Sequence, residues 1–226
     1  MKRHFFILGL TIFVALGCQS TAEPTEATEA SEAPQPGSAA NEDGGQDAVD
    51  SYQSPGVATF AGGCFWCMQR PFDEVQGVES TVVGYTGGEE ESPSYQEVVA
   101  GSTGHVEAVE IRFDADEVSY DELLDVFWRS MDPTDNEGQF ADRGDHYRPF
   151  VFYHNQTQRQ IAEASREQLD EHGPFDDPIV VDIVEASTFW IAEEYHQDYY
   201  KKNPEQYEAY YAGSGRKGFL EQVWGE

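Results

Sequence analysis

A change in composition near residue 55 constrains the fold of this chain more than any other feature. Residues 19–54 are rich in Glu, Ala, Thr, Ser, Pro, Gly and Gln. They carry eight acidic side chains, no basic ones and a single aromatic residue, Tyr52. Such a stretch buries too little apolar surface to offset the entropy lost on ordering, and its prolines disfavour a helix. We therefore predict a disordered acidic tether over 18–54 and one folded domain over 55–226.

The N-terminus, "MKRHFFILGLTIFVALGC", has the pattern of an export signal. Two basic residues precede an apolar run over 5–16, which is too short to span a membrane comfortably, so residues 1–17 are predicted to be a signal peptide. The run into Cys18 resembles the lipobox of bacterial lipoproteins, although Ala15 stands where Leu is usual. In those proteins the cysteine is lipidated and becomes the first mature residue. The resemblance implies an exported, lipid-anchored protein of the cell envelope that faces the periplasm. The alternative is an ordinary cleaved signal that discards Cys18.

The charge of the chain limits its partners. The formal net charge is −30 at pH 7, and a field of that sign repels nucleic acid and anionic lipid surfaces. We therefore expect no nucleic-acid partner, and contact with the membrane only through the lipid anchor. We interpret the negative charge as a solubility feature rather than as an acidic recognition surface.

Hydrophobic periodicity predicts alternating strands and helices in the folded domain. The expected strands cover 57–62, 78–88, 105–113, 149–155 and 178–186, and the expected helices cover 65–75, 119–131, 157–173 and 192–204. The order β-α-β-β-α-β, followed by α-β-α, matches the split βαβ unit with additions. We therefore predict an α+β fold, a two-layer sandwich with a ferredoxin-like split βαβ core and extra helices.

Two cysteines lie three residues apart in "FAGGCFWCMQR", residues 60–70. Cys64 and Cys67 could form half of a zinc site, but zinc needs four ligands and no second cysteine pair is present, so no metal is predicted. They could form a thioredoxin-like dithiol, although Phe-Trp replaces the usual Gly-Pro between them. One of them could be a nucleophile at a strand-to-helix turn, or both could be buried core residues. The turn favours a nucleophile, because Gly62 and Gly63 permit tight geometry and the helix N-terminus stabilises a thiolate.

The pentapeptide "GGCFW" resembles the catalytic signature of the type A peptide methionine sulfoxide reductases, which act on the S epimer of methionine sulfoxide. Five further blocks resemble the same family in the same order, so the similarity covers residues 57–204. These blocks are "GYTGG" (84–88), "SYQEVVAGSTGHVEAV" (94–109), "FWRSMDPT" (127–134), "DRGDHYR" (142–148) and "HQDYYKKNP" (196–204).

The resemblance implies roles for the residues that match the family's motifs. Cys64 matches the nucleophile that attacks the sulfoxide sulfur, and Phe65 and Trp66 match the apolar cage for the substrate methyl group. Glu107 matches the acid that protonates the sulfoxide oxygen.

Three more residues match positions in the family's site. Tyr95 and Tyr147 match two phenols that hydrogen-bond it, and Asp142 matches a polar residue that helps to arrange the site. The histidines in matching blocks are interpreted as structural: His105, His146 and His196.

The alternation of the strand 105–113 supports Glu107 independently. Glu107 falls on the same face as Val109 and Ile111, whereas Glu110 and Arg112 fall on the other. A carboxyl group on the apolar face is partly desolvated, which raises its pKa and keeps a proton available, as a general acid requires. The alternative is a glutamate at the frayed end of the strand that reaches solvent.

The chain departs from the family at its tail, where many members carry resolving cysteines and residues 207–226 carry none. Cys67 stands where many members have Gly, Gln69 stands where many have Glu, and Pro71 should kink the following helix or delay its start. One helical turn brings Cys64 and Cys67 together, so Cys67 is predicted to resolve the oxidised nucleophile. The alternative is that Cys67 only packs and an external thiol acts directly.

These features predict an oxidative-damage repair enzyme that reduces S-epimer methionine sulfoxide, free or in proteins, through a sulfenic acid on Cys64 that Cys67 resolves. The expected enzyme is a monomer without a cofactor, and its partner is a thioredoxin-like or other dithiol reductant. Two alternatives remain open: a thiol–disulfide oxidoreductase that acts on other envelope proteins, and a non-enzymatic anchored module with an aromatic pocket around Phe65 and Trp66.

Overall fold

The computed structural model of the protein describes residues 56–225. The signal peptide, the anchor at Cys18 and the tether predicted for 1–54 lie outside the described residues. Within residues 56–225, no helix is both long and apolar enough to cross a membrane.

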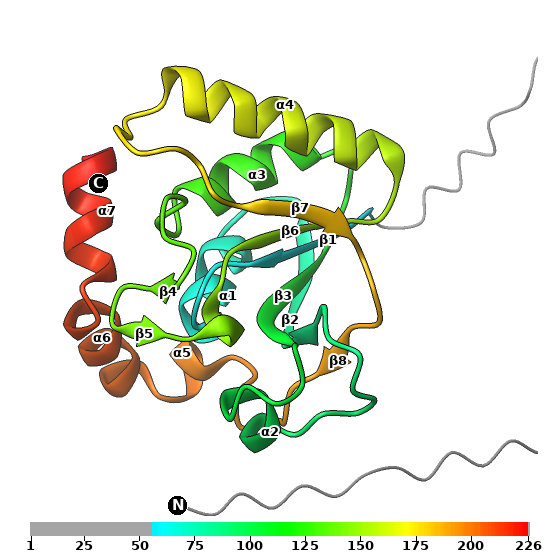
Figure 1. The fold of residues 1–226 in the computed structure, drawn as a ribbon, viewed down its shortest axis with the longest axis vertical. Helices are drawn as coiled ribbons and strands as arrows, with labels where there is room; N and C mark the ends of the chain where they lie inside the picture. The colour runs from blue at the N-terminus through cyan, green and yellow to red at the C-terminus, as the bar shows by residue number, and fades with distance from the viewer. Residues whose placement is uncertain (1–55, 226) are drawn as a thin grey trace, which may run out of the picture. The chain divides into compact units, whose positions relative to one another are not determined.

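A mixed six-stranded sheet forms the centre of the fold, in the order β7-β6-β1-β3-β2-β8 (Figure 1). Only β6 and β7 pair in parallel, and the other neighbours are antiparallel. The bounds of the six strands are β1 Gly56–Ala61, β2 Val78–Thr86, β3 Val106–Phe113, β6 Phe150–Tyr153, β7 Asp182–Glu185 and β8 Trp190–Ile191. A separate two-stranded ribbon pairs β4 (Gly138–Gln139) with β5 (Asp142–Arg143). The prediction of an α+β fold is confirmed.

Seven α-helices and one 3₁₀ helix surround the sheet in the described part of the chain. They are α1 Phe65–Asp73, α2 Tyr95–Val99, α3 Tyr120–Trp128, η1 Asp145–Tyr147, α4 Gln156–His172, α5 Tyr199–Lys202, α6 Pro204–Gly213 and α7 Arg216–Trp224. Local capping determines where several of them begin. The Ser119 hydroxyl accepts a hydrogen bond from the backbone N–H of Glu122, which satisfies a free donor at the start of α3. Helix α1 starts at Phe65 and continues through Pro71, so the proline does not delay its start.

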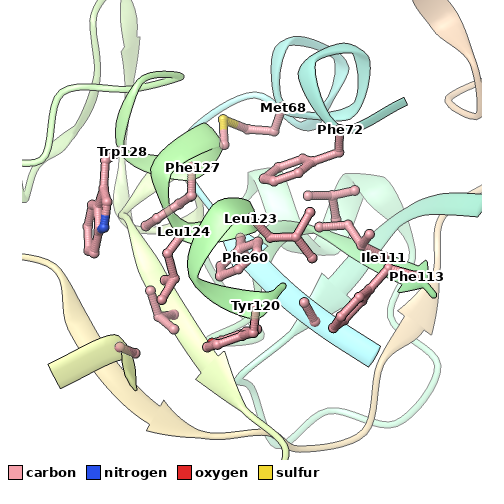
Figure 2. Close-up of a cluster of buried hydrophobic side chains, with 14 of the residues drawn as sticks. Phe60, Met68, Phe72, Ile111, Phe113, Tyr120, Leu123, Leu124, Phe127 and Trp128 are labelled. Carbon is pink, nitrogen blue, oxygen red and sulfur yellow. The ribbon is translucent and has the colours of Figure 1, made fainter. Parts of the chain in front are cut away.

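The main core lies between one face of the sheet and helices α1, α3 and α4 (Figure 2). The ring of Phe60 from β1 stacks on Phe72 of α1 at 5.5 Å and on Phe127 of α3 at 4.9 Å. Burying each aromatic or aliphatic side chain of this kind contributes about 1.5–3 kcal/mol. Strand β3 directs alternate residues into this core, among them Val109 and Ile111, which are fully buried.

The segment 192–198 does not form the helix predicted over 192–204. Residues 194–198 form turns, and the chain becomes helical only at α5. The amide of Gln197 hydrogen-bonds to both the backbone N–H and the carbonyl of Val83, so this segment is tied to β2. Asp198 then adopts a left-handed conformation with φ 53°, which interrupts a helix. Tertiary hydrogen bonds therefore override the local helical pattern.

Candidate active site

Cys64 lies at the turn between β1 and α1, at the N-cap of the helix. Its carbonyl accepts hydrogen bonds from the backbone N–H groups of Cys67 at 3.0 Å and Met68 at 3.3 Å. Gly63 precedes it with φ +85°, and a Cβ atom there would lie 2.5 Å from the Cβ atom of Gln139. Only glycine fits this position, so the tight turn predicted from the sequence is present.

Cys64 and Cys67 are free thiols, 4% and 1% exposed, whose side chains hydrogen-bond to each other. Burial, more than any other cause, raises the pKa of the Cys64 thiol well above its usual value. The hydrogen bond from Cys64 lowers the pKa of Cys67, and the guanidinium of Arg216 acts in the same direction. At the N-terminus of α1 the Cys64 side chain makes no capping hydrogen bond, and burial is the largest influence on its pKa.

Glu107 lies on β3 with 1% of its surface exposed, and its Oε2 atom accepts a hydrogen bond of 3.0 Å from the backbone N–H of Phe65. This bond holds the carboxyl group against the residue that follows Cys64. Burial and then the neighbouring Cys64 raise the pKa of Glu107 well above its usual value. Glu107 is buried, which excludes the solvent-reaching alternative. The predicted alternation holds in the second half of β3, where Arg112 is exposed, but Val106 and Ala108 on the opposite face from Glu107 are buried as well.

Tyr95 begins α2 and Tyr147 ends η1, and both side chains are half-buried. Burial, followed by the charges of Glu107 and Cys64, raises the pKa of Tyr95 to about 12 and that of Tyr147 well above its usual value. Both phenols therefore keep their protons near neutrality and have an O–H group available to donate a hydrogen bond.

Asp142 on β5 contacts the site through a residue that the sequence analysis did not identify. The hydroxyl of Tyr210 donates a hydrogen bond of 2.6 Å to the Oδ2 atom of Asp142, and the same hydroxyl lies within hydrogen-bonding reach of the Cys64 side chain. Tyr210 belongs to α6, in the tail that we considered only for its missing cysteine. The helical spacing of Tyr207, Tyr210 and Tyr211 was the available signal for a packed helix there.

The two aromatic residues between the cysteines pack around His196. The ring of Phe65 is 1% exposed and lies 4.9 Å from the His196 ring. The indole N–H of Trp66 donates to the Nδ1 atom of His196 at 3.1 Å, and the Trp66 ring stacks on Tyr199 at 3.8 Å. The sequence analysis missed Tyr199 as part of this aromatic group.

Arg216, the first residue of α7, is another residue that sequence reasoning missed. Its guanidinium is fully buried and donates to the carbonyl oxygens of Gly62 at 2.9 Å and of Ser130. It therefore stabilises the Gly-Gly turn through the carbonyl of Gly62 and places a positive charge near Cys67. All the predicted site residues within 56–225 are brought together around this turn. Cys18 lies outside the described residues.

Comparison with known proteins identifies close relatives of this chain. Residues 56–226 match the family described as "Peptide methionine sulfoxide reductase". The chain is 57% identical over 169 residues to the peptide methionine sulfoxide reductase MsrA of Bacillus licheniformis, which covers 75% of this chain and 93% of the relative. It is also 57% identical to the corresponding protein of Bacillus subtilis, over 75% of this chain and 96% of that protein.

Solved structures share the fold. Mxr1 from Saccharomyces cerevisiae in reduced form is 30% identical with a TM-score of 0.61, covering 66% of this chain and 86% of that one. Methionine sulfoxide reductase A of Corynebacterium diphtheriae is 33% identical with a TM-score of 0.58, covering 67% of this chain and 77% of that one.

An α+β domain with a buried cysteine at a strand-to-helix turn, beside a buried carboxyl group of raised pKa and two phenols, has the features of a cysteine-dependent oxidoreductase. The chain belongs to the peptide methionine sulfoxide reductase family. It is a peptide-methionine (S)-S-oxide reductase, and its reaction is the reduction of methionine sulfoxide. The prediction from the sequence blocks is confirmed.

Proposed function

We propose that Cys64 and Glu107 carry the first half of the reaction together. The Cys64 sulfur attacks the sulfoxide sulfur while Glu107 donates its proton to the sulfoxide oxygen. Methionine leaves, and the oxygen stays on Cys64 as a sulfenic acid. The observation that carries this proposal is the bond from the Phe65 N–H to Glu107, which holds the acid against the turn that carries the nucleophile.

The cysteine pair supplies the nucleophile. Because Cys64 donates a hydrogen bond to Cys67, the two sulfur atoms share one proton when the pair carries a single negative charge. Transfer of that proton to Cys67 leaves Cys64 as the thiolate. When Cys64 is a thiolate, the hydroxyl of Tyr210 turns its single proton from Asp142 to that sulfur and stabilises the charge.

The remaining residues orient the substrate. Phe65 and Trp66 provide an apolar wall for the methyl group of methionine sulfoxide, and Tyr95 and Tyr147 donate hydrogen bonds to its oxygen. Because both phenols stay protonated, their hydrogen bonds stabilise the negative charge that develops on the sulfoxide oxygen until Glu107 delivers the proton.

Cys67 completes the cycle as the resolving thiol. Its sulfur attacks the sulfenic acid on Cys64, a disulfide forms, and the oxygen leaves as water. The hydrogen bond between the two side chains and the single helical turn that joins them support this step. A thioredoxin-like or other dithiol reductant then reduces the disulfide of a monomeric enzyme.

We also infer that β6-β1-β3-β2 with α1 and α3 form a split βαβ core of two layers, as their order supports.

Separated epimers of methionine sulfoxide test this assignment. With dithiothreitol as reductant, the wild-type protein should consume the S epimer and leave the R epimer, and the Cys64→Ser variant should consume neither. Turnover of both epimers at equal rates would contradict the assigned site.

The N-terminal sequence motivates a proposal about location. Cys18 would carry the lipid, and the 36 residues of 19–54 would span roughly 30–36 Å as a flexible chain. Such a tether lets the catalytic domain of residues 55–226 work near the envelope membrane without resting on its anionic surface. Cys18→Ala should move the protein from the membrane fraction to the soluble fraction, as cell fractionation and immunoblotting would show. Wild-type protein found in the soluble fraction would refute the anchor.

A further inference from the structure

A cavity of about 620 Å³ opens against Cys67 between helices α1, α3, α6 and α7. Arg70, Tyr207 and Leu220 line it with Cys67. Its wall contains none of the residues that we assign to the sulfoxide, since Cys64, Phe65, Trp66 and Glu107 all lie outside it. The cysteine pair therefore has different surroundings on its two sides: Cys64 lies among the residues assigned to the sulfoxide, and Cys67 lies in the wall of a separate cavity.

We propose that this cavity is the entry site for the thiol reductant, which attacks the Cys67 sulfur of the Cys64–Cys67 disulfide. The proposal rests on the resolving role of Cys67 proposed above. Besides the dithiol reductant proposed above, the cavity accepts a low-molecular-weight peptide thiol, because it has the volume of a small-ligand site.

The positive charge beside Cys67 favours the approach of the reductant to that sulfur atom. The attacking species is a thiolate, which carries a negative charge. The carboxyl group of Asp142 opposes negative charge at Cys64. At Cys67 the buried guanidinium of Arg216 has a larger effect than either Asp142 or Glu107 alone. An incoming thiolate is therefore better tolerated on the side of Cys67.

The wall of the cavity is balanced in charge, in a chain whose formal net charge is −30. The wall contains three cationic side chains and an equal number of carboxylates. The cations are Arg70, Arg129 and Lys217, and the carboxylates are Glu74, Glu208 and Glu221. Arg70 bridges two of these carboxylates, with contacts of 2.9 Å to Glu74 and 2.7 Å to Glu208. A peptide thiol carries an ammonium group and carboxylates, so this lining offers partners for both signs.

The proposed exchange is balanced in atoms and electrons. The reductant thiolate forms a bond to the Cys67 sulfur, the bond between Cys64 and Cys67 breaks, and Cys64 leaves as a thiolate that takes up a proton. A second reductant thiolate attacks the mixed disulfide and releases Cys67. Two molecules of the peptide thiol are thereby oxidised to one disulfide, and the protein returns to the dithiol form.

Glutathione is the probe for the first test. Wild-type protein is oxidised with methionine sulfoxide without reductant, and the intact mass is measured to establish that the disulfide has formed. Glutathione is then added briefly, free thiols are alkylated in acid, and the mixed disulfide is located by peptide mass spectrometry. We expect glutathione on Cys67 and the alkyl label on Cys64. The reverse pattern would overturn the proposed entry site. Failure of the disulfide to form at all would instead contradict the resolving role of Cys67.

A cavity-filling variant gives the second test. Leu220→Trp places a larger side chain in the wall, and Gln222→Trp adds the same side chain at an exposed position of α7 outside the cavity. The rate constant for reduction of the disulfide by glutathione should fall at least about tenfold in Leu220→Trp, equivalent to about 1.4 kcal/mol, and stay at the wild-type value in Gln222→Trp. The amount of methionine released in the first, reductant-free turnover shows that each variant is folded. Equal rate constants in the two folded variants would overturn the proposal.

Discussion

Replacing Cys64 with serine is expected to abolish the reduction of methionine sulfoxide. The reaction requires a sulfur nucleophile that takes over the oxygen as a sulfenic acid, and a serine hydroxyl cannot do this. Cys64 is also the sulfur atom that the hydrogen-bonding groups of the site surround, because Tyr210 and Cys67 both bond to it. The measurement is methionine release from the S epimer with dithiothreitol, for the variant beside the wild-type protein.

The same assay separates the alternatives that the sequence left open. A thiol–disulfide oxidoreductase would exchange disulfides and leave methionine sulfoxide unchanged, and a binding module would do neither. The matched control is Cys67→Ser, which removes the other thiol of the pair and keeps the nucleophile. Methionine release by a folded Cys64→Ser variant at the wild-type rate would contradict the assignment of the nucleophile.

Glu107→Gln is expected to slow sulfoxide reduction by about 10²–10⁴-fold, the usual cost of losing general acid catalysis. Glutamine has nearly the same shape, but it cannot deliver a proton to the sulfoxide oxygen. Because burial raises the pKa of Glu107, the wild-type carboxyl group still carries its proton when most surface carboxylates have lost theirs. As pH rises above that raised pKa, the wild-type rate should fall, and this decline should be missing from the variant.

The control for this prediction lies on the same strand. Glu110 points to the opposite face of β3 and is partly exposed, so Glu110→Gln makes the same chemical change away from the cysteine pair. It should leave the rate within a small factor of the wild-type value. Unchanged turnover in a folded Glu107→Gln variant would remove the carboxyl group from the mechanism.

The parts of the site that follow from local pattern were predictable from the sequence. Glycine geometry placed Cys64 at a tight turn, and strand alternation placed Glu107 on the buried face. The family blocks then added Tyr95, Tyr147 and Asp142, whose side chains have no local signal of their own.

Residues that reach the site from the end of the chain could not be predicted in this way. Tyr210 and Arg216 belong to α6 and α7, which lie beside the β4–β5 ribbon and the turn before α1 (Figure 1). Their roles depend on contacts over more than 60 positions in the sequence. The turn segment 192–198 was missed for the same reason, because the side chain of Gln197 bonds to Val83 on a distant strand.

One mixing experiment without reductant tests the central claim, that Cys64 reduces the sulfoxide and Cys67 resolves the product. Reduced protein is mixed with S-epimer methionine sulfoxide, and methionine, free thiols and intact mass are measured. We predict one methionine per enzyme, loss of both thiols of the catalytic domain, and a mass lower by two hydrogen atoms, as one disulfide requires. Cys67→Ser should release the same methionine and stop at a sulfenic acid that a trapping reagent detects. Wild-type protein that accumulates this sulfenic acid, with Cys67 still open to alkylation, would contradict the account.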